Sequence, residues 1–359
     1  MKRCITCLYP VTKPDLAFDE RGECSACRNY ANRPEVDWEA RHKELLRLLD
    51  THNGECIVPS SGGKDSTYIA MRLKELGAHV TAVTATTCYL TPIGRRNIDN
   101  LARHVRTIEY TPDRGIRKKL NRMALDMVGD LSWPEHVLIH RVPFMLGQEL
   151  NTPLLFYGEC PNNQYGGPQG TENIKQMTAE WVSEFAGFLG LRAEDFIGLE
   201  GITERNMRDY MAPEAPDVEA HFLGWFEPWD SHRNAETAIN AGMEACLPTP
   251  ANLWPHENLD NAMTGLHDAG CYRKFGYGRF VAQASVDIRS GRENREEMLN
   301  KALEVDGLFP WTYAGVGLAE VLDWLEIRGS TLMEALNSHT NFELFSGVDN
   351  GRPILGDKF

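Results

Sequence analysis

The chain has 359 residues, 42% of them hydrophobic, which is enough to bury the core of one large or two medium domains. Its 51 acidic and 37 basic residues give a formal net charge of −14, which argues against a broad nucleic-acid surface. No stretch approaches the roughly 18 consecutive apolar residues of a membrane span, and no signal peptide precedes Cys4. We therefore expect a cytoplasmic protein that binds no nucleic acid.

Four cysteines near the N-terminus have the spacing of a metal site. Cys4 and Cys7 form one C-x-x-C pair, and Cys24 and Cys27 form a second pair further along the chain. Four thiolates at this spacing are typical of a closed zinc site, so residues 1–32 are predicted to form a structural zinc-knuckle module. An iron–sulfur cluster is the alternative, because four thiolates also suit that chemistry.

The most specific motif lies where a predicted strand, 56–59, meets a predicted helix, 65–76. The connecting sequence is Ser60-Ser61-Gly62-Gly63-Lys64-Asp65-Ser66. Its two glycines allow backbone N–H groups to approach an anion closely, and the N-terminus of the helix favours negative charge. The spacing is neither that of a Walker loop nor that of a dinucleotide fingerprint. The loop therefore predicts a phosphate site, with an ordinary glycine-rich turn as the alternative.

The chain from residue 54 onward alternates apolar runs with helical patterns, which is typical of βαβ units in a parallel sheet. We predict strands at 56–59, 79–85, 107–110, 154–157 and 222–225, and helices at 38–49, 65–76, 95–104, 116–127 and 135–150. The expected fold is α/β with a doubly wound parallel sheet. Its predicted parts are the zinc module, a linking helix at 33–53, a sheet domain at 54–290 with an insertion around 159–220, and a helical C-terminal region at 291–359.

Ligands of doubly wound sheets gather at the carboxyl ends of the strands. The segments at that edge are predicted to be 60–66, 86–89, 111–113, 158–165 and 227–230. We assign to ATP binding the phosphate loop and one residue after the second strand: Ser60, Ser61, Gly62, Gly63, Lys64, Asp65, Ser66 and Thr86.

The sequence from Ser61 to Ser66 resembles the S-G-G-x-D-S loop of the PP-loop ATPases, which have an adenine nucleotide α-hydrolase-like fold. The resemblance implies that the protein adenylates a carbonyl-type oxygen and releases pyrophosphate. It places Ser61, Gly62, Gly63 and Ser66 on the pyrophosphate and Asp65 near its magnesium ion, whereas Lys64 occupies a variable position of the family.

A wider set of motifs resembles the bacterial N-acetyl sugar amidotransferases, from Cys4 to about residue 307. The motifs are the two cysteine pairs with Phe18-Asp19-Glu20 and Arg28-Asn29-Tyr30, the segments 58–68 and 93–101, Tyr157-Gly158-Glu159-Cys160-Pro161, Tyr165-Gly166-Gly167-Pro168, Gly265-Leu266-His267-Asp268, Lys274-Phe275-Gly276-Tyr277-Gly278-Arg279 and the segment 284–291.

This second resemblance implies conversion of a sugar acetamido group to an acetamidino group, for O-antigen or nonulosonic acids. The sugar is free or nucleotide-linked. Ammonia comes from a separate glutaminase subunit, with a cyclase-like subunit in some systems. ATP, magnesium and structural zinc are the expected cofactors.

Several polar residues, most of them outside the phosphate loop, are predicted to act in catalysis or to bind the substrate. As catalytic residues we predict Asp65, Glu159, His267, Lys274 and Arg279, and as substrate-binding residues Glu159, Asn162, Tyr165, His267 and Asp268. The basic glycine-containing segment 273–279 suits contact with phosphate or an acidic sugar group. The alternatives are a solvated basic turn, a plain turn carboxylate at Glu159, and a structural pair of His267 with Asp268.

Two other classes of protein compete with this interpretation. A PP-loop tRNA thiolase could use Cys88 and Cys160 as a persulfide pair, because each follows a predicted strand. The acidic net charge and the absence of a recognisable RNA-binding appendage argue against it. A nucleotide-binding scaffold that docks through its zinc module is the non-enzymatic alternative.

Overall fold

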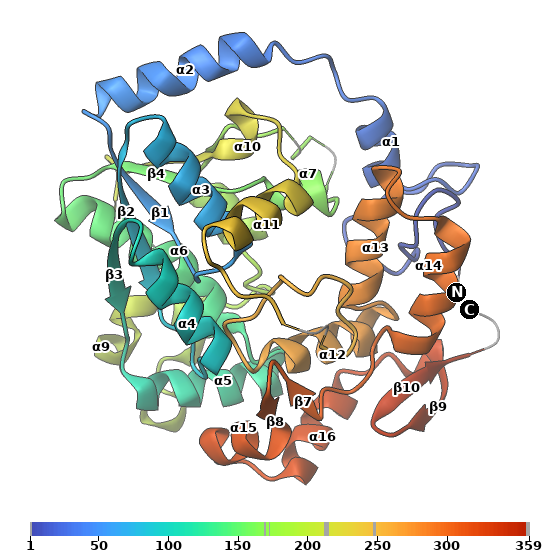
Figure 1. Ribbon diagram of the computed structural model, residues 1–359. Helices are drawn as coiled ribbons and strands as arrows, with labels where there is room; N and C mark the ends of the chain where they lie inside the picture. The colour runs from blue at the N-terminus through green and yellow to red at the C-terminus, as the bar shows by residue number, and fades with distance from the viewer. Residues whose placement is uncertain (1, 169, 172, 212–214, 247–248, 357–359) are drawn as a thin grey trace.

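The computed structural model describes residues 2–356 except 169, 172, 212–214 and 247–248. Its centre is a six-stranded sheet in the order β3-β2-β1-β4-β6-β5 (Figure 1). The strands are β1 (Glu55–Pro59), β2 (His79–Ala85), β3 (Arg106–Tyr110), β4 (Leu154–Tyr157), β5 (Gln176–Met177) and β6 (Glu219–Phe222). All neighbours pair in parallel except the edge strand β5, which is antiparallel to β6. The predicted parallel sheet is therefore confirmed.

Helices cover both faces of this sheet. They are α2 (Trp38–Thr51), α3 (Lys64–Glu75), α4 (Pro92–Leu101), α5 (Arg114–Val128), α6 (Trp133–Glu149) and α10 (Leu223–Phe226). Because successive side chains of a strand point to opposite faces, Ile57 packs with α5 and α6, whereas Cys56 and Val58 pack with α2, α3, α4 and α10. The sheet is thus doubly wound, as expected.

Local capping explains where several of these helices begin. The Asp37 side chain accepts the N–H of Ala40 at the start of α2, and the Thr91 hydroxyl accepts that of Gly94 at the start of α4. Asp113 does the same for α5. Each side chain satisfies a backbone donor that has no partner within the helix. The predicted helices and the first four predicted strands all lie within three residues of the observed bounds.

The predicted strand at 222–225 is wrong. The strand β6 ends at Phe222, and Leu223 to Phe226 form the short helix α10. Leu223 and Phe226 are both buried against the sheet, and the N–H of Glu227 donates to the carbonyl of Leu223. Apolar residues three apart fit one helical turn better than a strand, in which they would face opposite ways.

The segment between β4 and β6 packs onto the face of the sheet that α5 and α6 cover. It contains α7 (Pro161–Gln164), β5, α8 (Ala179–Phe185), α9 (Glu204–Met207) and 3₁₀ turns at Ala193–Phe196, Leu199–Gly201 and Arg208–Tyr210. Phe196 and Tyr210 lie against Trp133 of α6, with ring centroids 4.4 and 6.0 Å away. This insertion therefore shares the main core.

The chain after β6 adds helices and two hairpins. The helices are α11 (Ser231–Asn240), α12 (Thr264–Phe275), α13 (Arg279–Arg289), α14 (Arg295–Val305), α15 (Leu318–Leu325) and α16 (Gly329–Ser338), with a 3₁₀ turn at Phe342–Leu344. The hairpins are β7 (Thr312–Tyr313) with β8 (Val316–Gly317), and β9 (Phe345–Asp349) with β10 (Arg352–Leu355). The sequence analysis expected a helical region at 291–359, which agrees with α14, α15 and α16, but it predicted neither α11 to α13 nor the hairpins; residues 357–359 lie outside the described part.

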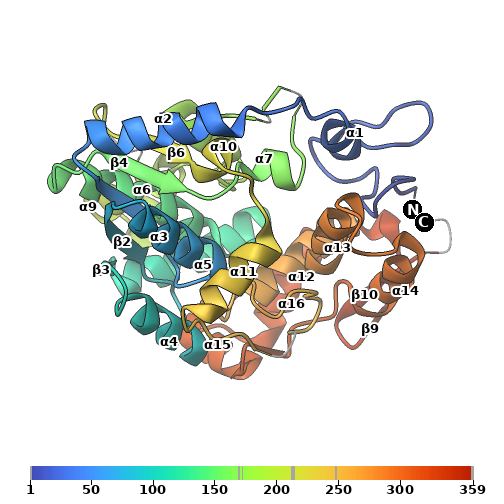
Figure 2. The same cartoon turned by 45° about the horizontal axis from the view of Figure 1, so that its top comes forward.

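The N-terminal module, which includes α1 (Ser25–Ala31), packs on α13 and α14 (Figure 2). Leu8 and Tyr9 are buried there with Phe280 and Met298. Arg295 adds two hydrogen bonds, to the carbonyls of Cys4 and Cys7. Among the helices of the described residues, none combines the length and apolar character that a membrane span requires.

Candidate functional site

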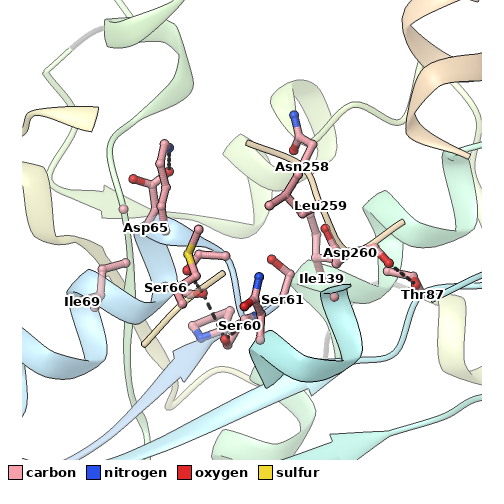
Figure 3. A pocket seen from close by; sticks show the side chains of 18 of the residues that line it. Ser60, Ser61, Asp65, Ser66, Ile69, Thr87, Ile139, Asn258, Leu259 and Asp260 are labelled. Carbon is pink, nitrogen blue, oxygen red and sulfur yellow. Dashed lines mark hydrogen bonds and ion pairs between the residues drawn. The ribbon is translucent and has the colours of Figure 1, made fainter. Parts of the chain in front are cut away.

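A cavity of about 280 Å³ lies at the carboxyl ends of β1, β2 and β4. Its walls are the loop 60–66, the ends of β2 and β4, the first turns of α4, part of α6, and the segment 256–260. Figure 3 shows Asn258, Leu259 and Asp260 facing Ser60 and Ser61 across it. This is the edge at which doubly wound sheets bind ligands, so the sequence placed the loop correctly at the ligand-binding edge.

A chain of hydrogen bonds folds the loop. The N–H of Gly62 donates to the Ser60 hydroxyl at 3.0 Å, the Ser60 hydroxyl donates to that of Ser66 at 3.0 Å, and the Ser66 hydroxyl donates to the carbonyl of Gly63 at 3.2 Å. Gly63 is the N-cap of α3 and has no side chain with which to cap it. The first-turn N–H groups of α3 therefore point to a place where an anion would satisfy them.

Only glycine fits at position 62. Its φ is +75°, and a Cβ there would lie 2.7 Å from the backbone nitrogen of Ile98 and 2.9 Å from the carbonyl carbon of Asn97. Both contacts are with the backbone of α4, which cannot move aside as a side chain could. The loop is thus held closely against α4, and this contact fixes the shape of the cavity.

Lys64 is a buried cation, 3% exposed, between two carboxylates. Its Nζ lies 2.8 Å from Oε2 of Glu257 and also pairs with Asp65. Asn234 of α11 donates to the other oxygen of Asp65 at 3.1 Å. Burial opposes the charge on Lys64, but the two carboxylates outweigh it and raise its pKa, so the residue is an ammonium ion at neutral pH.

The segment 256–260 was missed by the sequence analysis. Burial, with the nearby charge of Lys64, lowers the pKa of His256 to about 4, so this ring is neutral at pH 7. Burial raises the pKa of Asp260 to about 6. The segment follows no strand, so the rule that ligands gather after strands could not find it; its one signal is the polar run His256-Glu257-Asn258.

Thr87, rather than Thr86, lines the cavity. The Thr86 hydroxyl donates to that of Thr111 at 3.0 Å, and its carbonyl accepts a hydrogen bond from Arg117. Side chains alternate along the extended chain, so Ala85 and Thr87 face the ligand side and Thr86 faces away. The assignment of Thr86 to ATP binding stays a prediction that this placement does not favour.

Of the site residues predicted after β4, none lines the cavity itself. Gly158 lines it, while Glu159 lines a smaller neighbouring cavity, where burial raises the pKa of its carboxyl group. The amide of Asn162 donates to the Thr171 hydroxyl at 2.9 Å and so holds its own loop. Tyr165 does not line the cavity; burial and the charge of Glu257 raise the pKa of its hydroxyl group, opposed by Lys64 and Arg279.

The predicted residues of α12 and α13 form a second polar cluster beyond Tyr165. His267 Nδ1 lies 2.7 Å from Asp130, whose charge outweighs burial and raises the pKa of the imidazole. Asp268 accepts two hydrogen bonds from Arg279, at 2.8 and 3.2 Å. His267 is thus paired with Asp130 and not with Asp268. Lys274 lies in the last turn of α12. None of these residues lines the 280 Å³ cavity.

Cys88 and Cys160 are both buried, 7% and 2% exposed, and belong to different apolar clusters. Neither lines the cavity. A persulfide pair needs two thiols that meet each other and the substrate. The described structure therefore gives no support to the thiolase alternative.

The four N-terminal cysteines cluster as a metal site would require. Their sulfur atoms all lie within 4.8 Å of one another, with Cys4 to Cys27 at 3.9 Å and Cys7 to Cys24 at 3.7 Å. A zinc tetrahedron with Zn–S bonds of about 2.3 Å has sulfur–sulfur edges of about 3.8 Å. Three backbone N–H groups, of residues 6, 7 and 24, point to the sulfur of Cys4 at 3.3 to 3.5 Å. The group fits a closed, structural zinc ion.

The backbone contact of Gly62 yields a first prediction. Gly62→Ala should lower the free energy of unfolding by roughly 1–2 kcal/mol because of the positive φ. The clash with α4 should lower it by about 1–3 kcal/mol more, and the variant should no longer bind ATP. Gly201→Ala is the matched control, because Gly201 has a φ of +76° and open space around it. Urea unfolding and ATP titration measure both effects, and equal losses in the two variants would contradict the steric argument.

The raised pKa of Asp260 predicts a pH dependence of stability. The folded state binds this proton more tightly than the unfolded chain, whose aspartates titrate near pH 3.9, so its contribution is lost as pH rises from about 4 to about 6. Asp260→Asn should therefore gain about 2 kcal/mol in unfolding free energy relative to the wild type between pH 4.5 and 7. A difference between the two proteins that stays constant over this range would show that Asp260 titrates normally.

One region of the chain has a recognisable relative. Residues 255–350 match the family model described as LPS biosynthesis protein WbpG-like, C-terminal domain. The match spans roughly a quarter of the chain, and a comparison with curated proteins finds no match. The matched residues include the wall of the cavity at 256–260 as well as α12 and α13. This part of the chain, which is similar to the C-terminal domain of an LPS biosynthesis protein, thus helps to form the candidate site.

Proposed function

We propose that the protein is an ATP-dependent amidotransferase that converts the acetamido group of a sugar to an acetamidino group during synthesis of a surface polysaccharide or nonulosonic acid. The proposal rests on one observation: two distant parts of the chain line the same cavity. Its floor is the glycine-rich loop before α3, which suits pyrophosphate, and its wall is the segment 256–260, which lies in the region similar to an LPS biosynthesis protein.

The proposed chemistry begins with activation of the amide. The acetamido oxygen attacks the α phosphate of ATP, an O–P bond forms, the bond to the β phosphate breaks, and the amide N–H loses its proton. The loop 60–66 holds the departing pyrophosphate through its N–H groups and serine hydroxyls. Asp65 would hold a magnesium ion, which in such sites typically takes one or two carboxylates together with phosphate oxygens and neutralises their charge.

Ammonia then adds to the imidate carbon, and the C–O bond to AMP breaks. His267, paired with Asp130, and Arg279, paired with Asp268, lie outside the 280 Å³ cavity, and the charge of Arg279 acts on Tyr165. We assign to His267 the uptake of a proton from the adding ammonia, because the carboxylate of Asp130 would stabilise the imidazolium ion that forms. A separate glutaminase subunit, alone or with a cyclase-like subunit, supplies the ammonia.

The proposal is tested with a panel of acetamido sugars, ATP, magnesium and ammonium. We expect AMP and a sugar product in which one oxygen has been replaced by NH, both detected by mass spectrometry. Asp65→Asn should lower AMP formation about 100-fold or more, whereas the exposed control Asp323→Asn should not. No AMP and no altered sugar across the panel would leave the nucleotide-binding scaffold as the better account.

A further inference from the structure

A further cavity, of about 250 Å³, lies where the insertion between β4 and β6 packs on α6. We call it the aromatic cavity, because its lining includes the rings of Trp133, His140, Phe188 and Tyr210. Among the described residues, none lines both this cavity and the 280 Å³ cavity. The proposed reaction makes no use of it.

The aromatic wall is rigid. The ring of Trp133 packs against those of Phe196 and Tyr210, with centroids 4.4 and 6.0 Å away, and lies within 23° of parallel to the ring of Tyr210. All three side chains are buried. Since an apolar cavity of about 150 Å³ takes benzene, this one has room for a molecule of one or two rings.

The loop 187–191 forms another wall and has a strained backbone. Leu189 has a φ of +54°, and Gly187 and Gly190 each have a φ of +80°. Glycine tolerates this left-handed conformation, but leucine rarely adopts it. Strained backbone of this kind persists only where the surroundings impose it, and it is frequent at sites that hold ligands.

Two side chains of α6 hold this loop at its two ends. The indole Nε1 of Trp133 donates to the carbonyl of Leu191 at 3.2 Å, and Nδ1 of His136 donates to the carbonyl of Gly187 at 3.0 Å. Between these ends, Phe188 lines the aromatic cavity. The loop is thus fixed in the conformation that keeps the cavity open.

Two buried side chains of the lining have polar atoms without a hydrogen-bond partner in the described part of the chain. These atoms are Nδ1 of His140 and the hydroxyl of Tyr210, and the two residues are only 8% and 3% exposed. Burial lowers the pKa of His140 to about 3, so its ring is neutral at pH 7. Buried polar groups without a partner are rare in folded proteins, and a ligand with hydrogen-bonding atoms accounts for both of these.

The charged residues of the lining indicate that the ligand is neutral. Arg141 and Arg192 occur there together with Glu184 and Glu194, so their charges cancel. A charged ligand would gain no net attraction from this set and would lose its hydration. Aromatic side chains, in contrast, stack well on planar rings.

The helix α6 (Figure 1) also connects the aromatic cavity with the phosphate site. The ring of His140 stacks on that of Tyr157, with centroids 5.6 Å apart and the rings 27° from parallel. Tyr157 lines the 280 Å³ cavity. The two cavities therefore have separate linings but are separated at this point by two stacked rings.

We propose that the aromatic cavity is a second ligand site, which takes a neutral, planar heteroaromatic molecule of one or two rings. The aromatic wall accounts for the planarity, the cancelled charges for the neutrality, and the unpartnered polar atoms for the ring heteroatoms. The inference is independent of the proposed function, because it uses no residue of the phosphate site.

The test is a calorimetric titration of the full-length, metal-loaded protein at about pH 7 without ATP, ammonia or sugar. The planar probes are nicotinamide, benzimidazole and indole. The control probes are cyclohexanecarboxamide, which has the size of nicotinamide but a puckered ring, and nicotinate, which is its charged analogue. At least one planar probe should bind about 10-fold or more tightly than either control.

Two variants locate the binding. Ala193 lines the aromatic cavity and is buried, so Ala193→Phe should fill the cavity and weaken binding about 10-fold or more, whereas the exposed control Ala319→Phe should not. His140→Phe keeps a ring of similar shape and removes both ring nitrogens. It should weaken binding about 5-fold or more without lowering the temperature of thermal unfolding, because a buried nitrogen without a partner is lost.

Three results would overturn the second ligand site. They are no binding by any planar probe, equally tight binding of cyclohexanecarboxamide or nicotinate, and full planar-probe affinity in both Ala193→Phe and His140→Phe. Thermal unfolding shows whether each variant is folded, and His140→Phe keeps the test valid if Ala193→Phe is not. Since no step needs ATP or a sugar, the result does not depend on whether the proposed reaction occurs.

Discussion

The buried ion pairs of Lys64 are the interaction on which the candidate site depends. An ammonium ion in this position is tolerated because Asp65 and Glu257 compensate it, and removal of one partner from a buried pair typically costs about 3–5 kcal/mol. Asp65 belongs to the phosphate loop and Glu257 to the segment that forms the opposite wall, so the same contact that makes the charge tolerable also joins the two sides of the cavity.

With one positive and two negative groups the cluster carries a net charge of −1. The attraction for phosphate therefore comes from backbone N–H groups and from the N-terminus of α3. The two carboxylates favour a phosphate group that is already bound to a cation such as magnesium.

The rest of the molecule supports this junction from three directions. Gly62 holds the loop against α4 from one side, and Asn234 of α11 fixes Asp65 from another. Besides burial, charges from the cavity and from α13 act on Tyr165, since Glu257 raises its pKa while Lys64 and Arg279 lower it. The four-cysteine module lies further out, where its contacts with α13 and α14 place Tyr30 and Arg33 opposite Arg289.

The sequence predicted most of the sheet and the phosphate loop, because both depend on local patterns. The short apolar run of Cys56, Ile57 and Val58 marks a strand that is buried on both faces, and a glycine pair between strand and helix marks an anion site. It could not predict what depends on distant contacts. Glu257 reaches Lys64 from nearly 200 residues away, and no local rule links the two. Asp130 is likewise far from His267, so the pairing with Asp268 suggested by their adjacency was wrong. Leu223 and Phe226 lie in one helical turn that buries both side chains against the same face of the sheet, which their apolar character alone did not reveal.

The central claim is that an amide oxygen attacks the α phosphate held above this loop. The most direct measurement follows that oxygen. An acetamido sugar labelled with a heavy oxygen isotope in its acetyl carbonyl is incubated with the protein, ATP, magnesium and ammonium, and the nucleotide and phosphate products are analysed by mass spectrometry. The account predicts that the label appears in AMP and leaves pyrophosphate unlabelled. Label in inorganic phosphate together with ADP, or label that stays in the sugar while ATP is consumed, would contradict it.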